Sequence, residues 1–242
     1  MLATTVGWVN GGERPPHDPS VDGAADRVLL AGPEGFSGDL SRSVRIWREF
    51  LRGFWRLRNV GLCVTVFGSA RVDEHHRWYR TAREVGRLLG AEGFAVMTGG
   101  GPGVMEAANR GARDAGALSV GCTIELPREQ RPNEFLDLAV HFRYFFVRKV
   151  MLVKYSEAFV FLPGGFGTLD EVFETATLIQ TATIAGFPVV GLDRAYWEQI
   201  ERTVNDTMVT AGTIDPIDTR LFQITDDPKD AVAFLTDRLS GR

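Results

Sequence analysis

The sequence of 242 residues has little cysteine, no long apolar run and no excess of positive charge. Its two cysteines, Cys63 and Cys122, lie in apolar segments typical of strands, so we expect buried reduced thiols rather than a disulfide framework. No run approaches the ~20 apolar residues of a membrane span, and no apolar core of signal-peptide type is present. The net charge of −4 lacks the basic footprint of a dedicated nucleic-acid-binding protein. These absences favour a soluble, cytoplasmic protein.

The chain divides into a polar N-terminal part and a patterned remainder. Residues 1–40 are rich in Gly, Pro, Asp and Ser and lack apolar periodicity, which predicts a flexible tail. Because no second linker-like stretch follows, residues 41–242 are expected to form a single domain. Its first helix is expected at 41–57. Aromatic and apolar residues form one stripe of that helix and arginines the rest: Trp47, Phe50, Leu51 and Phe54, against Arg42, Arg45, Arg48, Arg52 and Arg56.

Two interpretations of this basic helix are open. It could lie on a membrane or a nucleic acid, or it could pack its aromatic residues on the core or a subunit interface with the arginines in solvent. The acidic balance of the whole chain favours the second interpretation.

After residue 60, apolar strand-like segments alternate with helical patterns. Strands are expected at 62–67, 94–97, 118–122, 138–143, 158–162, 188–192 and 222–224. Helices are expected at 77–91, after the 99–103 turn through 116, through about 156, after Thr168, and at 195–211 and 228–239. This alternation predicts a Rossmann-like, doubly wound α/β fold with a parallel sheet covered on both faces. Ligands of such sheets bind at the carboxyl ends of the strands, where the glycine-bearing turns 68–69, 99–103 and 164–167 all fall.

The most informative motif runs from Pro163 to Glu171 with the sequence PGGFGTLDE. A strand that turns through glycines into a helix N-terminus presents free N–H groups and a dipole that favours an anion. The same segment contains Thr168 and Glu171 at the spacing of a Thr-x-x-Glu capping box. The residues alone therefore leave Glu171 as either a helix cap or a catalytic acid.

The second glycine turn, 99–103, is followed by Val-Met-Glu. It is not a Walker A loop, because no Gly-Lys-Ser/Thr follows. It is also a poor dinucleotide fingerprint, because Glu106 stands where Gly or Ala is required. An NAD-dependent oxidoreductase is therefore disfavoured. The turn either presents backbone amides to one phosphate or is an ordinary tight turn.

Arg148 and Lys149 lie near the start of the helix expected before strand 158–162. A helix that feeds directly into a strand runs antiparallel to it, so its N-terminal end lies over the carboxyl end of that strand. We therefore expect Arg148 close to Glu171, where a guanidinium could grip a phosphate or orient a carboxylate. The alternative is a solvated surface cation.

Together, Arg148-Lys149, the motif at 163–171 and the segment GGGPGVMEAAN at 99–109 resemble the LOG ("lonely guy") family. The resemblance implies a Rossmann-like fold with the active site at the interface of a homodimer or higher homo-oligomer, and neither a cofactor nor a metal ion. It implies that Arg148 and Glu171 are the essential pair. The residues expected to contact the substrate are Ser69, Gly100, Gly101, Gly103, Glu106, Asn109, Glu129, Lys149, Gly164, Gly165, Phe166, Gly167, Thr168, Leu169, Asp170 and Thr177.

The resemblance implies a phosphoribohydrolase that cleaves the N-glycosidic bond of a nucleoside 5′-monophosphate, either a cytokinin riboside 5′-monophosphate or AMP. The alternative is a carrier of a nucleotide or of the molybdenum cofactor, which would need the glycine turns but not the Arg–Glu pair. Family members have often been mislabelled lysine decarboxylases. That activity requires a pyridoxal-binding lysine, and Lys149, Lys154 and Lys229 lack such a context.

Overall fold

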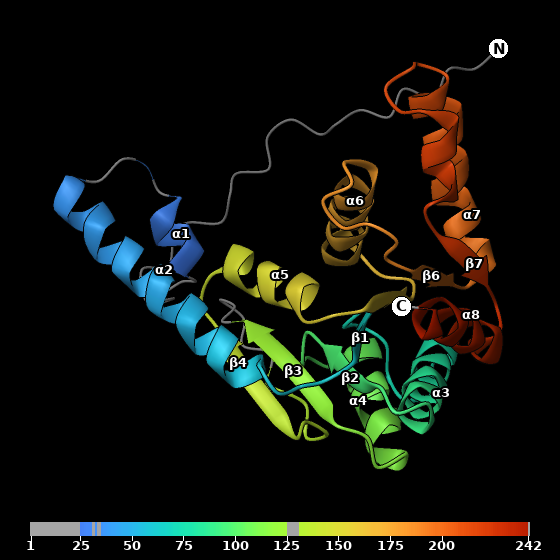
Figure 1. Ribbon diagram of the computed structural model, residues 1–242, viewed down its shortest axis with the longest axis horizontal. Helices are drawn as coiled ribbons and strands as arrows, with labels where there is room; N and C mark the ends of the chain where they lie inside the picture. The colour runs from blue at the N-terminus through green and yellow to red at the C-terminus, as the bar shows by residue number, and fades with distance from the viewer. Residues whose placement is uncertain (1–24, 31, 33–34, 125–130, 242) are drawn as a thin grey trace.

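The computed structural model describes residues 25–30, 32, 35–124 and 131–241. Seven strands in that part of the chain form one parallel sheet with helices on both faces (Figure 1). The strand order is β4-β3-β2-β1-β5-β6-β7. The strands are β1 (Cys63–Phe67), β2 (Ala95–Thr98), β3 (Ser119–Ile124), β4 (Leu138–Phe142), β5 (Ala158–Phe161), β6 (Val189–Leu192) and β7 (Gln223–Thr225).

The helices form two layers, one on each face of the sheet. They are α1 (Ala25–Leu29), α2 (Phe36–Leu57), α3 (Arg77–Ala91), α4 (Val104–Asp114), α5 (Phe145–Lys154), α6 (Phe166–Gln180), α7 (Arg194–Thr203) and α8 (Pro228–Ser240). Alternate residues of each strand face opposite layers. In β1, Val64 and Val66 join the core under α3, α4 and α8, whereas Cys63 and Phe67 join the core under α2, α5, α6 and α7.

The doubly wound parallel sheet predicted from the sequence is confirmed, and each strand begins and ends within two residues of its expected bounds. The last expected helix before β7 is divided, because α7 continues into a π-helical segment, Val204–Val209. A 3-10 helix, Pro216–Arg220, then leads into β7.

The N-terminal part differs from the prediction. The sequence predicted a tail up to residue 40, but α1 lies within it and α2 begins at Phe36. Residues 1–24 lie outside the described part of the chain. Helix α1 is held to the domain by Asp26, whose carboxylate accepts a hydrogen bond from the backbone N–H of Phe145 at 2.8 Å.

The expected apolar stripe of α2 is split between two faces. Phe50 and Phe54 pack against the core, as predicted, but Trp47 and Leu51 are exposed. Arg42 is 5% exposed, so the prediction that all five arginines lie in solvent was wrong at this position. The apolar positions of α2 cover more than one helix face, which is why the single stripe predicted from the sequence was wrong.

Cys63 and Cys122 are both buried free thiols, in β1 and β3. Burial raises the pKa of Cys122 to about 12 and raises the pKa of Cys63 as well. Both are therefore neutral packing groups rather than nucleophiles. Within the described ranges, no helix is long and apolar enough to cross a membrane.

Helices α3 and α4 pack with their backbones in close approach at two glycines. A Cβ added to Gly111 would lie 1.9 Å from the carbonyl oxygen of Arg83. We predict that Gly111→Ala lowers the free energy of unfolding by about 3 kcal/mol, because the clash involves backbone atoms that cannot rotate away. Denaturant titration followed by circular dichroism measures this.

The matched control is Gly167→Ala, a helical glycine with open space around its added Cβ. It should leave stability unchanged or slightly increased, because alanine is the better helix former. If Gly111→Ala unfolds at the same denaturant concentration as the parent, the close packing of α3 on α4 is refuted.

Candidate active site

A crevice lies at the carboxyl edge of the sheet, where β1 and β5 are neighbours and the strand order reverses. This topological switch point is where open α/β sheets bind ligands. The crevice has a volume of about 700 Å³. Its described walls are Phe67, Gly68, Ser69, Ala70, Arg71, Gly99, Gly100, Gly101, Met105, Thr123, Ile124, Phe145, Arg148, Gly165, Phe166, Gly167, Thr168, Leu169 and Glu171. All three glycine turns therefore meet in one site, as expected.

The turns after β1 and β5 are joined to each other and to α4. The backbone N–H of Ser69 donates to the carbonyl of Pro163 at 3.1 Å, and the N–H of Val104 donates to the carbonyl of Ser69 at 3.0 Å. Gly103 is the N-cap residue of α4 and does not line the crevice. The N–H of Val104, the first amide of α4, is thus bonded to the β1 turn rather than open to a ligand.

The backbone amides at the start of α6 are candidate anion donors of the crevice. Helix α6 begins at Phe166 after Gly165, with no side-chain cap. None of the hydrogen bonds found among the described residues is donated by the N–H of Phe166 or Gly167. First-turn amides have no partner inside their own helix, so these two can bind an anion. By contrast, the N–H of Gly100 is already bonded to the Thr98 hydroxyl at 2.9 Å.

Glu171 lies in the second turn of α6 and is 6% exposed. The capping-box interpretation is wrong, because Thr168 and Glu171 are both inside the helix and Gly165 precedes its first residue. Burial raises the pKa of Glu171 to about 7, although the charges of Lys149 and Arg148 lower it. A carboxyl group that is partly ionised near neutral pH can accept or donate a proton.

Arg148 is delivered to the crevice by α5, as predicted from the helix direction. Its Nε donates to the carbonyl of Cys122 in β3 at 2.7 Å. The guanidinium lies so close to Gly99 that a Cβ added there would overlap Nη2 of Arg148, so a larger residue at this position would displace the guanidinium. Burial lowers the pKa of Arg148, whereas the charge of Glu171 raises it. Even so, an arginine remains protonated, so the crevice keeps a cation beside its acid.

Lys149 ties α5 to α6 instead of lining the crevice. Its Nζ lies 2.9 Å from Asp170 Oδ2 and 2.9 Å from Glu174 Oε2. Burial alone would lower the pKa of Lys149, but the hydrogen bonds to Glu174 and Asp170 outweigh it and raise the pKa. An ammonium held by two carboxylates is a poor amine nucleophile, which argues against Schiff-base chemistry at this lysine.

Several residues expected at the substrate lie behind the crevice. Glu106 accepts a hydrogen bond from the Tyr79 hydroxyl at 2.8 Å. Asn109 is fully buried, accepts from the Thr98 hydroxyl at 2.6 Å and donates to Ser119 Oγ at 2.9 Å. Asn109 braces the 99–103 turn through Thr98, whereas Glu106 links α4 to α3. Glu129 lies outside the described residues.

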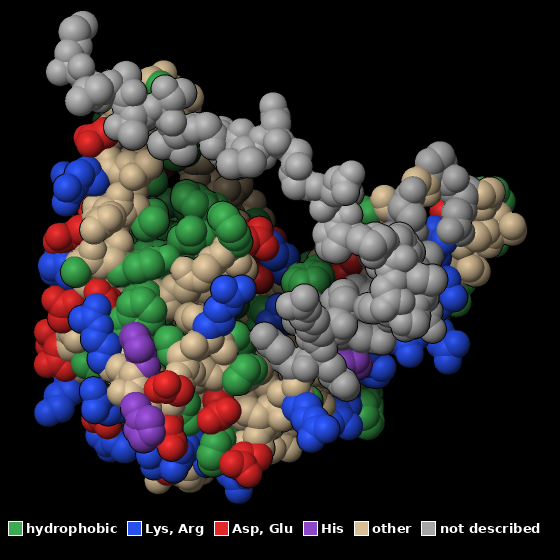
Figure 2. Space-filling model, turned by 180° about the vertical axis from the view of Figure 1, so that it is seen from behind, with side chains coloured by type: hydrophobic (Ala, Val, Ile, Leu, Met, Phe, Trp, Pro, Cys, Tyr) green, Lys and Arg blue, Asp and Glu red, His purple; other side chains and the backbone are tan. Residues whose placement is uncertain are grey.

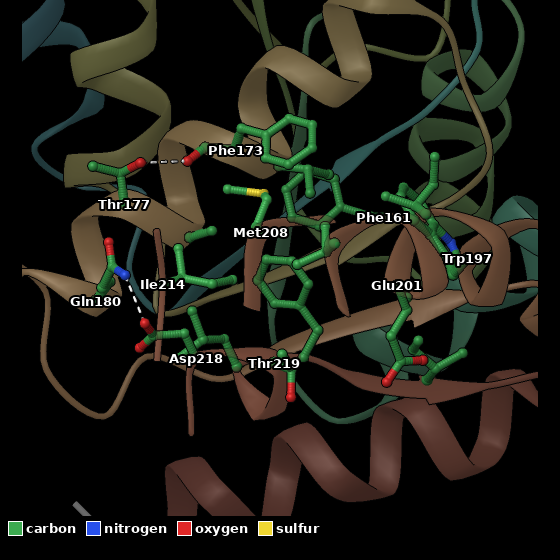
Figure 3. Close-up of a pocket in the computed structure, with 18 residues that line it drawn as sticks. Phe161, Phe173, Thr177, Gln180, Trp197, Glu201, Met208, Ile214, Asp218 and Thr219 are labelled. Carbon is green, nitrogen blue, oxygen red and sulfur yellow. Dashed lines mark hydrogen bonds between the residues drawn. The ribbon is translucent and has the colours of Figure 1, made fainter. Parts of the chain in front are cut away.

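Other expected positions fall at the edge of the site or away from it. Gly164 accepts a hydrogen bond at its carbonyl from the Tyr196 hydroxyl at 2.6 Å, and Phe166 is 92% exposed. Thr177 lies two turns beyond Glu171, and its hydroxyl donates to the carbonyl of Phe173 (Figure 3).

Thr177 lines a separate apolar cavity of about 160 Å³ between α6, α7 and the sheet (Figure 3). The side chains of Phe161, Phe173 and Met208 point into it, with the Gln180–Asp218 hydrogen bond at one side. Figure 2 shows apolar side chains gathered on the part of the surface that carries α6 and α7. This cavity contains neither Arg148 nor Glu171 and is not the crevice.

Several wall residues were not expected from the sequence, among them the polar residues Arg71 and Thr123. Arg71 lies two residues beyond Ser69. It could have been predicted from the same argument, that ligands bind at the carboxyl ends of parallel strands. Thr123 lies at the end of β3, where no glycine marks the turn. Its hydroxyl lies 3.1 Å from Nδ1 of His141. The described residues contain no group of three or more His, Cys, Asp or Glu side chains placed to hold a metal ion.

The fold and crevice define a doubly wound α/β protein with an anion-ready helix N-terminus, a partly buried arginine and a buried glutamate at its switch point. A family model described as "Possible lysine decarboxylase" matches residues 105–235. The chain belongs to this family, the LOG family that its motifs resemble.

The chain is similar to named relatives in the same family. It is 30% identical to a cytokinin riboside 5′-monophosphate phosphoribohydrolase of Mycobacterium tuberculosis over 162 residues, which cover 65% of this chain and 85% of that protein. It is 28% identical to a probable enzyme of the same name, LOG4, from Oryza sativa subsp. japonica, over 72% of this chain and 76% of the relative.

Among solved structures, the molybdenum cofactor carrier protein of Chlamydomonas reinhardtii matches with a TM-score of 0.55 and 23% identity, over 74% of this chain and 98% of that one. At this identity the match shows the shared fold alone.

The raised pKa of Glu171 predicts a pH-dependent stability. Its folded-state pKa of about 7 exceeds the ordinary 4.5. Between these values the folded state binds more protons, so the free energy of unfolding falls as pH rises, by about 3 kcal/mol in all. Glu171→Gln removes the buried charge. At pH 8 its free energy of unfolding should therefore exceed that of the parent by up to this amount, whereas at pH 5 the difference should be far smaller. Denaturant titration at both values measures the difference.

The control is Glu134→Gln, which removes an exposed carboxylate. Its free energy of unfolding should differ from that of the parent by the same amount at both pH values. A Glu171→Gln effect that does not change between pH 5 and pH 8 would contradict the buried charge.

Proposed function

We propose that this protein hydrolyses the N-glycosidic bond of a nucleoside 5′-monophosphate, a cytokinin riboside 5′-monophosphate or AMP, and releases the free base and ribose 5-phosphate. The names of the relatives support a phosphoribohydrolase. The observation that carries the proposal is that Arg148, Glu171 and the free first-turn amides of α6 face one crevice. A nucleotide carrier would need the amides but has no use for a buried acid.

The 5′-phosphate is proposed to bind at the amides of Phe166 and Gly167. This contact uses a group that does not react to position the one that does. Arg148 adds the positive charge that a phosphate beside Glu171 requires. The 99–103 turn then contributes a wall of the crevice, since the N–H of Gly100 is committed to Thr98.

Glu171 is proposed to act on the attacking water. As the bond from C1′ to the base nitrogen breaks, its electron pair leaves with the base and positive charge develops on the ribose. The carboxylate stabilises that charge and takes a proton from the water, whose oxygen bonds to C1′. The departing base nitrogen takes up a proton from solvent.

The proposal includes a homo-oligomer that acts in the cytoplasm. Exposed aromatic side chains beside the crevice, those of Phe145, Phe146 and Phe166, support contact with a second copy. The two buried free thiols are consistent with a reducing compartment.

The direct test is to incubate the protein with AMP and N6-substituted AMP and follow base release by chromatography. We predict that Glu171→Gln still binds the nucleotide but loses turnover by at least about 100-fold, because it can neither accept a proton nor stabilise a cation. Glu134→Gln, which alters an exposed carboxylate that is not among the crevice walls, should retain most of the activity. Full activity in Glu171→Gln, or tight binding by the parent without any base release, would refute the proposal.

The pH profile tests the role of Arg148. Activity that needs the Glu171 carboxylate should rise as pH increases through about 7. Because the charge of Arg148 lowers the pKa of Glu171, Arg148→Gln should move this acidic limb to higher pH as well as reduce the rate. Arg71→Gln is the control, since Arg71 lines the crevice but does not contribute to that pKa shift. An unmoved limb in Arg148→Gln would show that Arg148 does not act on Glu171.

A further inference from the structure

A third cavity lies on the other side of the α5 N-terminus, between α2 and the turn that joins β4 to α5. Its volume is about 850 Å³. We call it the arginine cavity. Its charged wall residues are Arg42, Arg45, Arg48, Arg52, Arg143 and Glu49. Five arginines therefore face one glutamate in a chain whose net charge is −4.

The arginines come from two elements that face each other. Arg45, Arg48 and Arg52 follow one another at three and four residues on α2, a spacing that places them on one helix face. Arg52 is fixed by a hydrogen bond from its guanidinium to the carbonyl of His141. Arg143 approaches from the β4–α5 turn. Figure 2 shows Lys and Arg side chains along the end of the molecule where α2 lies.

The acids at this cavity are already in use. Glu49 is 6% exposed, and one of its carboxylate oxygens accepts hydrogen bonds from the N–H groups of Arg143 at 2.9 Å and Tyr144 at 3.2 Å. Arg42 lies 3.7 Å from Asp39. Arg45 and Arg48 are exposed on the cavity wall, and none of the ion pairs found among the described residues involves either of them. Arg45 and Arg48 thus keep positive charge that the described carboxylates at the cavity do not pair with.

We infer that the arginine cavity binds a small polyphosphate anion, with two or more linked phosphate groups, at a site distinct from the crevice. One guanidinium group can donate hydrogen bonds to two phosphate oxygens at once. The described walls of the cavity contain five arginines and no lysine. Its volume is of the order of small-molecule sites, roughly 300–1,000 Å³. A long nucleic acid would need a basic track over a wider surface, whereas the rest of this chain is more acidic than the whole.

The site is connected to the crevice through adjacent residues. Tyr144 lines the arginine cavity and Phe145 lines the crevice. Arg148 lies one helical turn further along α5. An anion bound to Arg143 therefore contacts the segment that positions the start of α5.

Inorganic tripolyphosphate is the probe, used with the full chain in low-salt, metal-free buffer without phosphate or sulfate, and followed by isothermal titration calorimetry. The double variant Arg45→Gln/Arg48→Gln should weaken binding by about tenfold or more, because two charge-assisted contacts are lost. The matched control, Arg58→Gln/Arg80→Gln, removes two exposed arginines that do not line the cavity and should bind within about twofold of the parent. Circular dichroism verifies that both variants are folded.

Two further arms locate the site and define the ligand. Arg148→Gln, which affects only the phosphate site proposed in the crevice, should retain the binding that Arg45→Gln/Arg48→Gln loses. Complete loss of probe binding in Arg148→Gln would place the probe in the crevice and overturn the inference. Failure of the parent to bind, or equal weakening in both double variants, would overturn it as well. A single-stranded oligonucleotide that binds more tightly than tripolyphosphate, and loses binding in Arg45→Gln/Arg48→Gln, would replace the small anion with a nucleic acid.

Discussion

The buried carboxylate of Glu171 is the constraint on which the rest of the site depends. A carboxylate loses favourable hydration on burial, and the surrounding protein must supply compensating charge or hold the proton. Helix α5 supplies that charge through two consecutive residues with different partners. Arg148 reaches β3 through the Cys122 carbonyl, and Lys149 reaches α6 through Asp170 and Glu174. The compensation is incomplete, so the pKa of Glu171 stays near neutrality.

The proposed catalytic and anion-binding groups come from one short segment of the chain, although the sheet is built from strands far apart in the sequence. Helix α5, strand β5 and helix α6 follow one another within residues 145–180 and bring together Arg148, Glu171 and the free amides. The antiparallel course of a helix and the strand it feeds sets the position of Arg148. Strands β1 and β2 then close the crevice with turns from far earlier in the chain. The β1 turn is bonded to the β5 turn through Ser69 and Pro163, which fixes the two halves of the sheet at the point where the order reverses.

Patterns with a fixed period were predictable from the sequence, and contacts between distant side chains were not. Strand positions followed from short apolar runs, and the convergence of the glycine turns followed from the parallel topology. The Thr-x-x-Glu spacing gave a wrong prediction because α6 begins at Phe166, so Thr168 already lies inside the helix. Gly165, which occupies the N-cap position, has no side chain from which the cap could be predicted.

Tertiary packing decided the remaining residues. Asn109 has the same polar side chain whether it binds a ligand or bridges Thr98 and Ser119, so only the fold could assign it. The burial of Arg42 likewise depends on how α2 sits on the domain. Helix periodicity contains no information about either contact.

The position of Glu171 along α6 limits how a substrate can fit. The dipole of α6 favours a negative charge near its first turn, yet the pKa of Glu171 is raised, so desolvation outweighs the dipole. A phosphate bound at Phe166 and Gly167 would add repulsion if it lay beside the carboxylate. With a rise of 1.5 Å per residue, Glu171 is about 7 Å along the helix axis from Phe166. That separation leaves the length of a ribose between phosphate and acid, and places developing positive charge on the sugar where the carboxylate can stabilise it.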